Sequence, residues 1–145
     1  MKWFNFYGFI IMIVIMIPNI VFSLTNKDGF QNKYMNAKLE MLEQISRFSC
    51  FTLMIINIPF LTKGYWFSNG EVVYIFLNII LCTLYCLFWI IFWNKSSITK
   101  SLLLSIIPSV MFIADGIILL NIPLIIFSVV FSICHITISY KNAIL

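Results

Sequence analysis

Long apolar runs separated by short polar stretches are the feature that most constrains this chain. Between residues 3 and 139 each run covers about 17 to 22 positions and holds at most one charged side chain. A helix needs about 20 apolar residues to cross the hydrocarbon core of a bilayer, which is about 30 Å thick. Because 62% of the residues are hydrophobic and only 10% are charged, a soluble domain of this size could not cover its own surface. The runs therefore predict an all-α membrane protein.

Five such runs divide the sequence, and no repeat or soluble segment of domain length separates them. We expect residues 1–145 to form a single integral membrane domain. The predicted spans are residues 3–24, 45–61, 72–93, 101–120 and 122–139. The first run has the position of a signal peptide, but it exceeds the usual apolar core of about 7 to 15 residues. We therefore expect it to be retained as a span.

A charged amphipathic stretch precedes the second span. Leu39, Leu42 and Ile45 recur at three-residue spacing, and charged side chains occupy the positions between them. This pattern is typical of a helix that lies at the membrane surface. The predicted fold is a five-transmembrane-helix bundle with an interfacial amphipathic helix before the second span.

The apolar stretch 101–139 must contain a turn, because as one helix it would be about 58 Å long, roughly twice the hydrocarbon thickness. The sequence Asn121–Pro123 leaves a span of sufficient length on either side and puts proline in the first turn of a helix, where it is tolerated. The sequence Asp115–Gly116 would bring the acid to water, but only about 14 apolar residues precede it. We favour the turn at Asn121–Pro123.

Basic residues are distributed unequally between the two sides of the predicted spans. One side collects seven Lys or Arg residues, Lys27, Lys33, Lys38, Arg47, Lys95, Lys100 and Lys141, and the other collects Lys2 and Lys63. Because cytoplasmic loops carry the excess of basic residues, we expect the N-terminus outside and the C-terminus in the cytoplasm. The basic residues are scattered over short loops and form no patch, so no nucleic-acid partner is expected.

Three polar side chains fall near the outer surface within the predicted spans, Asn57, Asn78 and Asp115. An Asp at the centre of a span costs about 2.5 to 3.5 kcal/mol on insertion scales, so it calls for an explanation. If the helices are neighbours, Asp115 could accept hydrogen bonds from both Asn side chains and form a site for a cation or a solute. The interpretation we favour is that the Asn residues join helices, worth about 0.6 kcal/mol each, while Asp115 lies at a turn or is protonated.

A second polar group is expected on the cytoplasmic side. Glu43 and Arg47 are one helical turn apart, and His135 and Asn19 lie near the inner ends of their spans. A His beside a carboxylate and an Arg can shuttle protons or bind an anionic headgroup. The favoured alternative is an ion pair along one helix, worth a few tenths of a kcal/mol, with a separate interfacial His.

The four cysteines, Cys50, Cys82, Cys86 and Cys134, all lie in apolar segments and are expected to be free thiols. Cys82 and Cys86 share a helix face, but no His or carboxylate accompanies them, so no metal site is predicted. No catalytic or cofactor-binding motif is present, and we expect neither a cofactor nor an enzymatic activity.

Three short sequences suggest a relationship. They are P-N-I at 18–20, L-E-Q-I-S-R-F at 42–48 and H-I-T-I-S at 135–139, in a chain rich in Ile, Phe, Asn and Lys. With these features the chain resembles small uncharacterised membrane proteins of low-GC Gram-positive bacteria. The resemblance implies a bacterial plasma membrane and carries no function.

The favoured function is a non-enzymatic interaction, immunity-like or accessory subunit that contacts another membrane protein or a second copy of itself. The alternative is a small solute or ion transporter that works as a homo-oligomer, with its site at Asn57, Asn78 and Asp115. An intramembrane enzyme using Glu43, Arg47 and His135 is the least favoured reading. The lipid bilayer is the one partner that the composition itself requires.

Overall fold

Five α-helices make up the described part of the protein. The computed structural model describes residues 3–25, 34, 36–95 and 97–144. The helices are α1 (Phe6–Thr25), α2 (Ala37–Ile55), α3 (Gly70–Ile91), α4 (Ile98–Ile118) and α5 (Ile122–Ile144). All but α2 are long and apolar enough to cross a membrane. The prediction of an all-α membrane protein is confirmed to this extent, and no strand is formed in the described parts of the chain.

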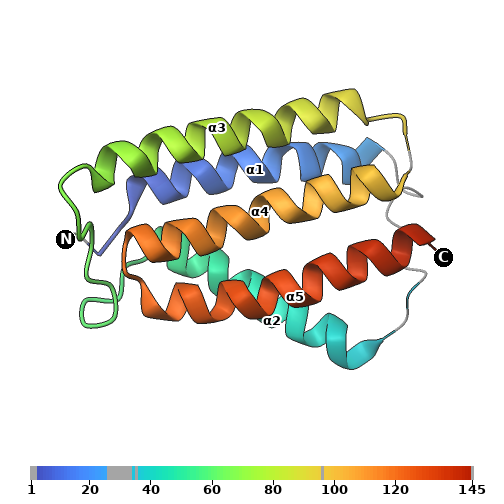
Figure 1. Ribbon diagram of the computed structural model, residues 1–145. Coiled ribbons are helices and arrows are strands. Elements are labelled where there is room, and N and C mark those ends of the chain that lie inside the picture. Colours follow the sequence, from blue (N-terminus) through green and yellow to red (C-terminus); the bar gives the residue numbers. More distant parts are fainter. Residues whose placement is uncertain (1–2, 26–33, 35, 96, 145) are drawn as a thin grey trace.

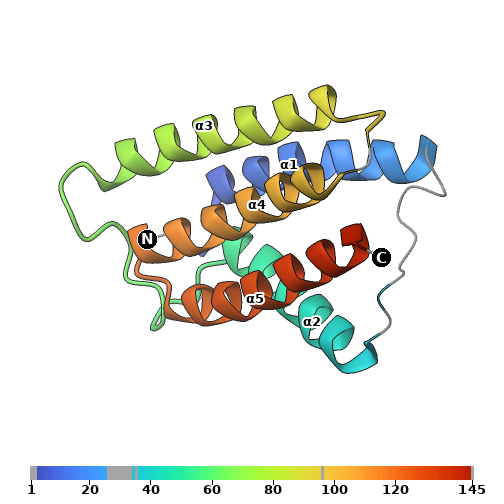
Figure 2. The same cartoon turned by 45° about the vertical axis from the view of Figure 1, so that its right-hand side comes forward.

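The helices form a closed ring in the contact order α1, α2, α5, α4, α3 and back to α1, and α2 also contacts α4 inside the ring. Figures 1 and 2 show the same neighbours in two views, with α1 and α3 side by side and α5 next to both α2 and α4. Ring order differs from chain order because α2 and α5 pack together although two helices separate them in sequence. The lengths of the connections alone therefore did not indicate the ring order.

The largest difference from the predicted spans concerns α2. The amphipathic stretch is not a separate interfacial helix, because it forms the first part of one continuous helix from Ala37. At the other end, the helix stops at Ile55 and not at residue 61, since Ile56 is extended, with φ −110° and ψ 126°. Pro59 favours the early end, because it has no N–H to donate to the Ile55 carbonyl, which accepts a hydrogen bond from the Asn5 N–H. Backbone hydrogen bonds hold the segment that follows to the N-terminal segment and to the α4–α5 turn, while its apolar side chains, among them Phe60 and Leu61, are exposed.

The turn between α4 and α5 lies at 119–121, next to the position that we favoured. Asp115 and Gly116 are both within α4. Leu120 adopts a left-handed conformation with φ 45°, which allows the chain to reverse at once. Asn121 is fully buried, and its Oδ1 accepts a hydrogen bond from the Leu124 N–H, 3.2 Å away, as a helix N-cap does. Its Nδ2 donates to the Leu53 carbonyl of α2, 3.3 Å away.

The connection from α2 to α3 packs onto this turn. The Ile122 N–H donates to the Leu61 carbonyl at 3.2 Å, and the Gly64 N–H donates to the Leu119 carbonyl at 2.8 Å. Gly64 has φ 90°, a conformation that glycine adopts readily. The connection and the turn thus close one end of the bundle together, and the N-terminal segment joins them there.

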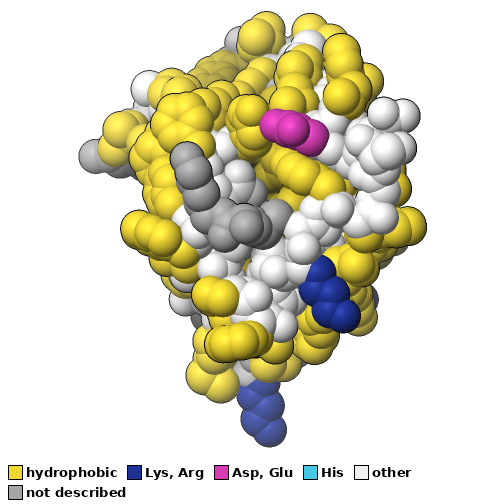
Figure 3. Space-filling view, turned by 90° about the vertical axis from the view of Figure 1, so that its left-hand side faces the viewer, with side chains coloured by type: hydrophobic (Ala, Val, Ile, Leu, Met, Phe, Trp, Pro, Cys, Tyr) yellow, Lys and Arg dark blue, Asp and Glu magenta, His cyan; other side chains and the backbone are white. Residues whose placement is uncertain are grey.

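Charged side chains are sparse at this end, as the space-filling view of it shows (Figure 3). Lys63 lies in the connection there, and Glu71 begins α3. The opposite end carries the described basic residues Lys38, Lys95, Lys100 and Lys141. Lys2, Lys27 and Lys33, which also entered the predicted charge asymmetry, lie outside the described residues.

Candidate functional site

Asn78 of α3 and Asp115 of α4 form the polar pair at the sparsely charged end. Asn78 Nδ2 donates to Asp115 Oδ1 over 2.7 Å and to the Tyr74 carbonyl of its own helix, also over 2.7 Å. Asp115 is fully buried, and Asn78 is 2% exposed. Among the described residues, Asn78 Oδ1 and Asp115 Oδ2 accept no hydrogen bond. Two adjacent buried oxygens without donors are unusual, because nearly all buried polar atoms are paired.

Asn57, the third residue of the predicted outer site, lies at the same end but not within a helix. It is buried in the connection that follows α2, where its backbone N–H donates to the Trp3 carbonyl over 2.7 Å. The structure therefore joins Asn78 to Asp115, whereas Asn57 ties the connection to the N-terminal segment. The prediction placed Asn57 at a matching depth but assumed that α2 continued past it.

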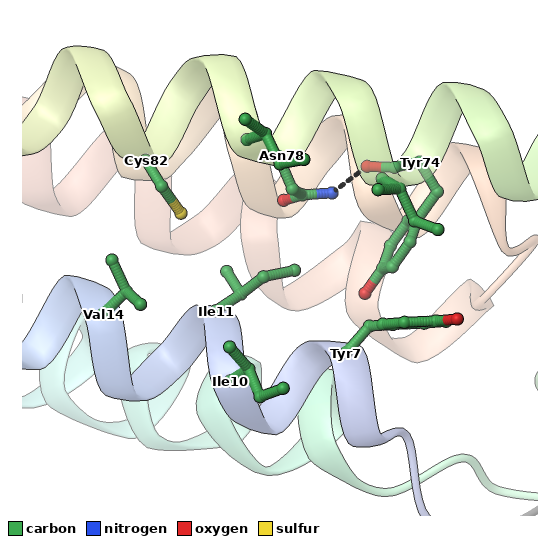
Figure 4. A pocket seen from close by; sticks show the side chains of 9 residues that line it. Tyr7, Ile10, Ile11, Val14, Tyr74, Asn78 and Cys82 are labelled. Carbon is green, nitrogen blue, oxygen red and sulfur yellow. Dashed lines mark hydrogen bonds between the residues drawn. The ribbon is translucent and has the colours of Figure 1, made fainter.

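A pocket of about 190 Å³ lies beside this pair, between α1 and α3. Its walls are mostly apolar, and Figure 4 shows Ile11 and Val14 pointing from α1 toward α3, with Tyr7 and Tyr74 at one end. Asn78 is the amide among the side chains that line it. The aromatic residues of the pocket and the amide at its wall were not predicted as one site, because the sequence does not show that α1 and α3 are neighbours.

Tyrosines and one more amide complete the surroundings of the pocket. Asn5 Nδ2 donates to the Tyr74 hydroxyl over 3.2 Å, and the Tyr7 hydroxyl lies 3.4 Å from Glu71 Oε1. Tyr65, in the connection before α3, packs edge-to-face on Tyr74 with ring centroids 5.9 Å apart. Burial, helped by the negative charge of Glu71, raises the pKa of Tyr65 to about 12. Its phenol is therefore neutral at physiological pH.

Three of the four predicted inner residues come together at the opposite end. Glu43 of α2 is 4% exposed, and its Oε1 contacts Arg47 Nη2 on the next turn and His135 Nδ1 of α5, 3.3 Å away. The His135 ring stacks on Phe131 with centroids 4.7 Å apart. This group joins α2 to α5. Its carboxylate is already matched by a guanidinium, so the ion pair neutralises a charge that would be costly inside the bundle.

Asn19, the fourth inner residue, belongs to a different contact. Its Nδ2 donates to the Tyr85 hydroxyl over 2.6 Å and joins α1 to α3. Close by, Lys100 of α4 lies over the rings of Phe22 and Trp89, with its Nζ 4.6 and 5.3 Å from their centroids. From the sequence, we expected Lys100 to be a basic residue of a connecting loop. Its pairing with aromatic rings depends on the order of the helices, which gave no signal in the sequence.

All four cysteines are free thiols, and Cys50 and Cys134 are buried. Within the described ranges, no three His, Cys, Asp or Glu side chains come together in a way that could hold a metal ion.

Comparison of the chain with protein-family models, with curated proteins and with solved structures found no match. The class of protein is therefore defined by the fold alone, as an all-helical protein with four helices suited to crossing a membrane.

Proposed function

We propose that this is a five-span protein of a bacterial plasma membrane that acts without enzymatic activity, as an interaction, immunity-like or accessory subunit. In this proposal α2 is the fifth span. Its 19 residues give about 28 Å of helix, close to the hydrocarbon thickness. It packs along α5, and its buried acid Glu43 is matched within the bundle by contacts with Arg47 and His135.

The proposed orientation has the N-terminus outside and the C-terminus in the cytoplasm. It is supported by the gathering of described basic side chains at the end where α2 begins and α5 ends, against Lys63 at the other. A bacterial plasma membrane agrees with the sequence resemblance to small Gram-positive membrane proteins. In this orientation the Asn78–Asp115 pair lies at the depth of the outer half of the bilayer.

The observation that carries the subunit proposal is that buried polar side chains join helices to one another. Asn5 bonds to Tyr74, Asn19 bonds to Tyr85, and Asn121 bonds to the Leu53 carbonyl. Polar groups used in this way stabilise a scaffold. What the scaffold presents to other membrane proteins is an apolar helix face, and α3 has a continuous one. Its exposed stripe consists of Phe76, Ile80, Leu84, Leu87 and Ile91.

A photo-crosslinking amino acid in this stripe tests the proposal. We expect a residue of this kind at Ile80 or Leu87 to give a discrete protein adduct in native membranes, either with one partner or with a second copy of the chain. Ile133 of α5 is 63% exposed and equally apolar, and it serves as the matched control that should react with lipid alone. Adducts with lipid only at every stripe position would contradict the proposal.

A second candidate function is supported by the buried carboxyl of Asp115. A small solute or ion transporter, working as a homo-oligomer, would use Asp115 and Asn78 as its site. The support is that Asp115 is fully buried and that its Oδ2 accepts no hydrogen bond from any described residue. Ionisable residues inside membrane proteins frequently mark ion or substrate pathways, because they are too costly to retain otherwise.

Flux into proteoliposomes tests this second function. We expect wild-type vesicles to pass H⁺, Na⁺ or K⁺ at least tenfold faster than empty vesicles, and Asp115→Asn to remove that excess while leaving the shape of the side chain intact. Glu71→Gln, which neutralises the other acid at the same end, is the matched control and should retain the flux. Wild-type vesicles that leak no faster than empty ones, or full flux in Asp115→Asn, would exclude transport of these ions.

A further inference from the structure

The pocket between α1 and α3 has the features of a binding site for an organic cation. It combines an apolar wall, two tyrosine rings and an amide whose carbonyl oxygen lacks a donor, and a buried carboxyl lies directly behind that amide. We propose that the pocket binds a small hydrophobic ammonium ion, whose positive group donates to Asn78 Oδ1 in front of the Asp115 carboxyl.

The polar end of the pocket accounts for the charge of the ligand. Asn78 Nδ2 is already committed to Asp115 Oδ1 and the Tyr74 carbonyl, so Asn78 can offer a ligand only its acceptor oxygen. An ammonium group supplies three donors and no acceptor. A cation at this oxygen would in turn favour the ionised form of Asp115, one hydrogen bond further in, and their attraction is strong where water is excluded. The rings of Tyr7 and Tyr74 stand at one end of the pocket, where an ammonium group within about 6 Å of a ring face would gain a cation–π contribution.

The apolar wall accounts for the rest of the ligand. The volume of about 190 Å³ is slightly larger than an engineered apolar cavity of about 150 Å³ that accepts benzene. One aryl ring or a short alkyl chain with an amino group therefore fits, whereas a lipid headgroup with its chains does not. The rim includes Tyr7, Ile10 and Ile79, which are 42%, 43% and 56% exposed, so the ligand can enter sideways between α1 and α3.

Fluorine NMR titration of the purified protein with 4-fluorobenzylammonium tests the inference. We expect saturable binding to the wild type and at least tenfold weaker binding to Asp115→Asn. The neutral 4-fluorobenzyl alcohol has the same ring and should also bind at least tenfold more weakly. Glu40→Gln removes an acid of the first turn of α2, which does not line the pocket, and should bind as the wild type does.

A second variant keeps the test decisive if Asp115→Asn fails to fold. Val14 faces the pocket from α1 (Figure 4), and Val14→Phe should fill part of the volume without touching the polar pair, weakening binding at least tenfold. The inference is overturned if the wild type shows no saturable binding, if Val14→Phe binds as tightly as the wild type, or if Glu40→Gln abolishes binding.

The inference rests on the Asp115 carboxyl, which the proposed transport function also uses. Ammonium binding and ion transport can be distinguished by experiment. Saturable binding by a protein that passes no ion in vesicles would retain this site and remove transport. Ion flux that depends on Asp115, without any binding of the ammonium probe, would retain transport and overturn the inference.

Discussion

Gly8→Ala should destabilise the protein by about 2 to 3 kcal/mol, near the upper end of what overpacking usually costs. A Cβ at Gly8 would lie 1.8 Å from the Met54 carbonyl oxygen and 2.8 Å from the Met54 carbonyl carbon of α2. Both are backbone atoms, so no change of side-chain rotamer can relieve the overlap. The start of α1 and the end of α2 would have to separate.

Separation would disturb hydrogen bonds that hold the two segments together. The Asn5 N–H donates to the Ile55 carbonyl over 2.6 Å, and the Asn57 N–H donates to the Trp3 carbonyl over 2.7 Å. The sign of the change in stability is informative, because alanine at a helix position is more favourable than glycine by about 0.8 to 1.0 kcal/mol. A chain in which α1 did not contact α2 at Gly8 would be stabilised by the same substitution.

Gly116→Ala is the matched control. It introduces the same methyl group in another helix–helix contact, where the nearest atom is a side-chain carbon of Ile125 at 2.9 Å and the nearest backbone atom is 3.2 Å away. Since the Ile125 side chain can move, the loss should be smaller than for Gly8→Ala. Equilibrium unfolding in mixed micelles measures both variants. A stability of Gly8→Ala equal to or above that of the wild type would show that the two helices do not approach as described.

The helical class and four of the predicted spans could be predicted because the signal is the length of each apolar run. Four predicted spans coincide with α1, α3, α4 and α5 to within a few residues. The end of α2 could not be placed by the same signal. The residues from Ile56 to Leu61 are as apolar as a span, but they fold back against the N-terminal segment and the α4–α5 turn. Pro59 was the available indication, and the apolar composition outweighed it in the prediction.

The candidate site was predictable where depth alone decides which residues meet. Asn78 and Asp115 were expected at one height, and they are in contact. Glu43 and Arg47 follow from helical spacing. By contrast, the pocket depends on α1 lying beside α3, and the partnership of Asn121 with the Leu53 carbonyl depends on α5 lying beside α2. Helix order is set by the shape of the packed faces, and single-residue patterns do not report it.

We propose that α2 crosses the membrane, with its first residue on the cytoplasmic side. Lys38 is exposed in the first turn of α2, Lys63 is exposed in the connection after α2, and Lys95 is exposed in the connection between α3 and α4. A single cysteine introduced at each position can be tested with a membrane-impermeant maleimide. The wild-type chain is the blank, since its own cysteines lie within helices.

We expect Lys63→Cys to be labelled in intact cells, and Lys38→Cys and Lys95→Cys to be labelled only after the membrane is permeabilised. Such a result places the two ends of α2 on opposite faces and the Asn78–Asp115 pair in the outer half of the bilayer. Equal labelling of Lys38→Cys and Lys63→Cys in intact cells would show that α2 does not cross. Labelling of Lys95→Cys with protection of Lys63→Cys would show that the orientation is reversed.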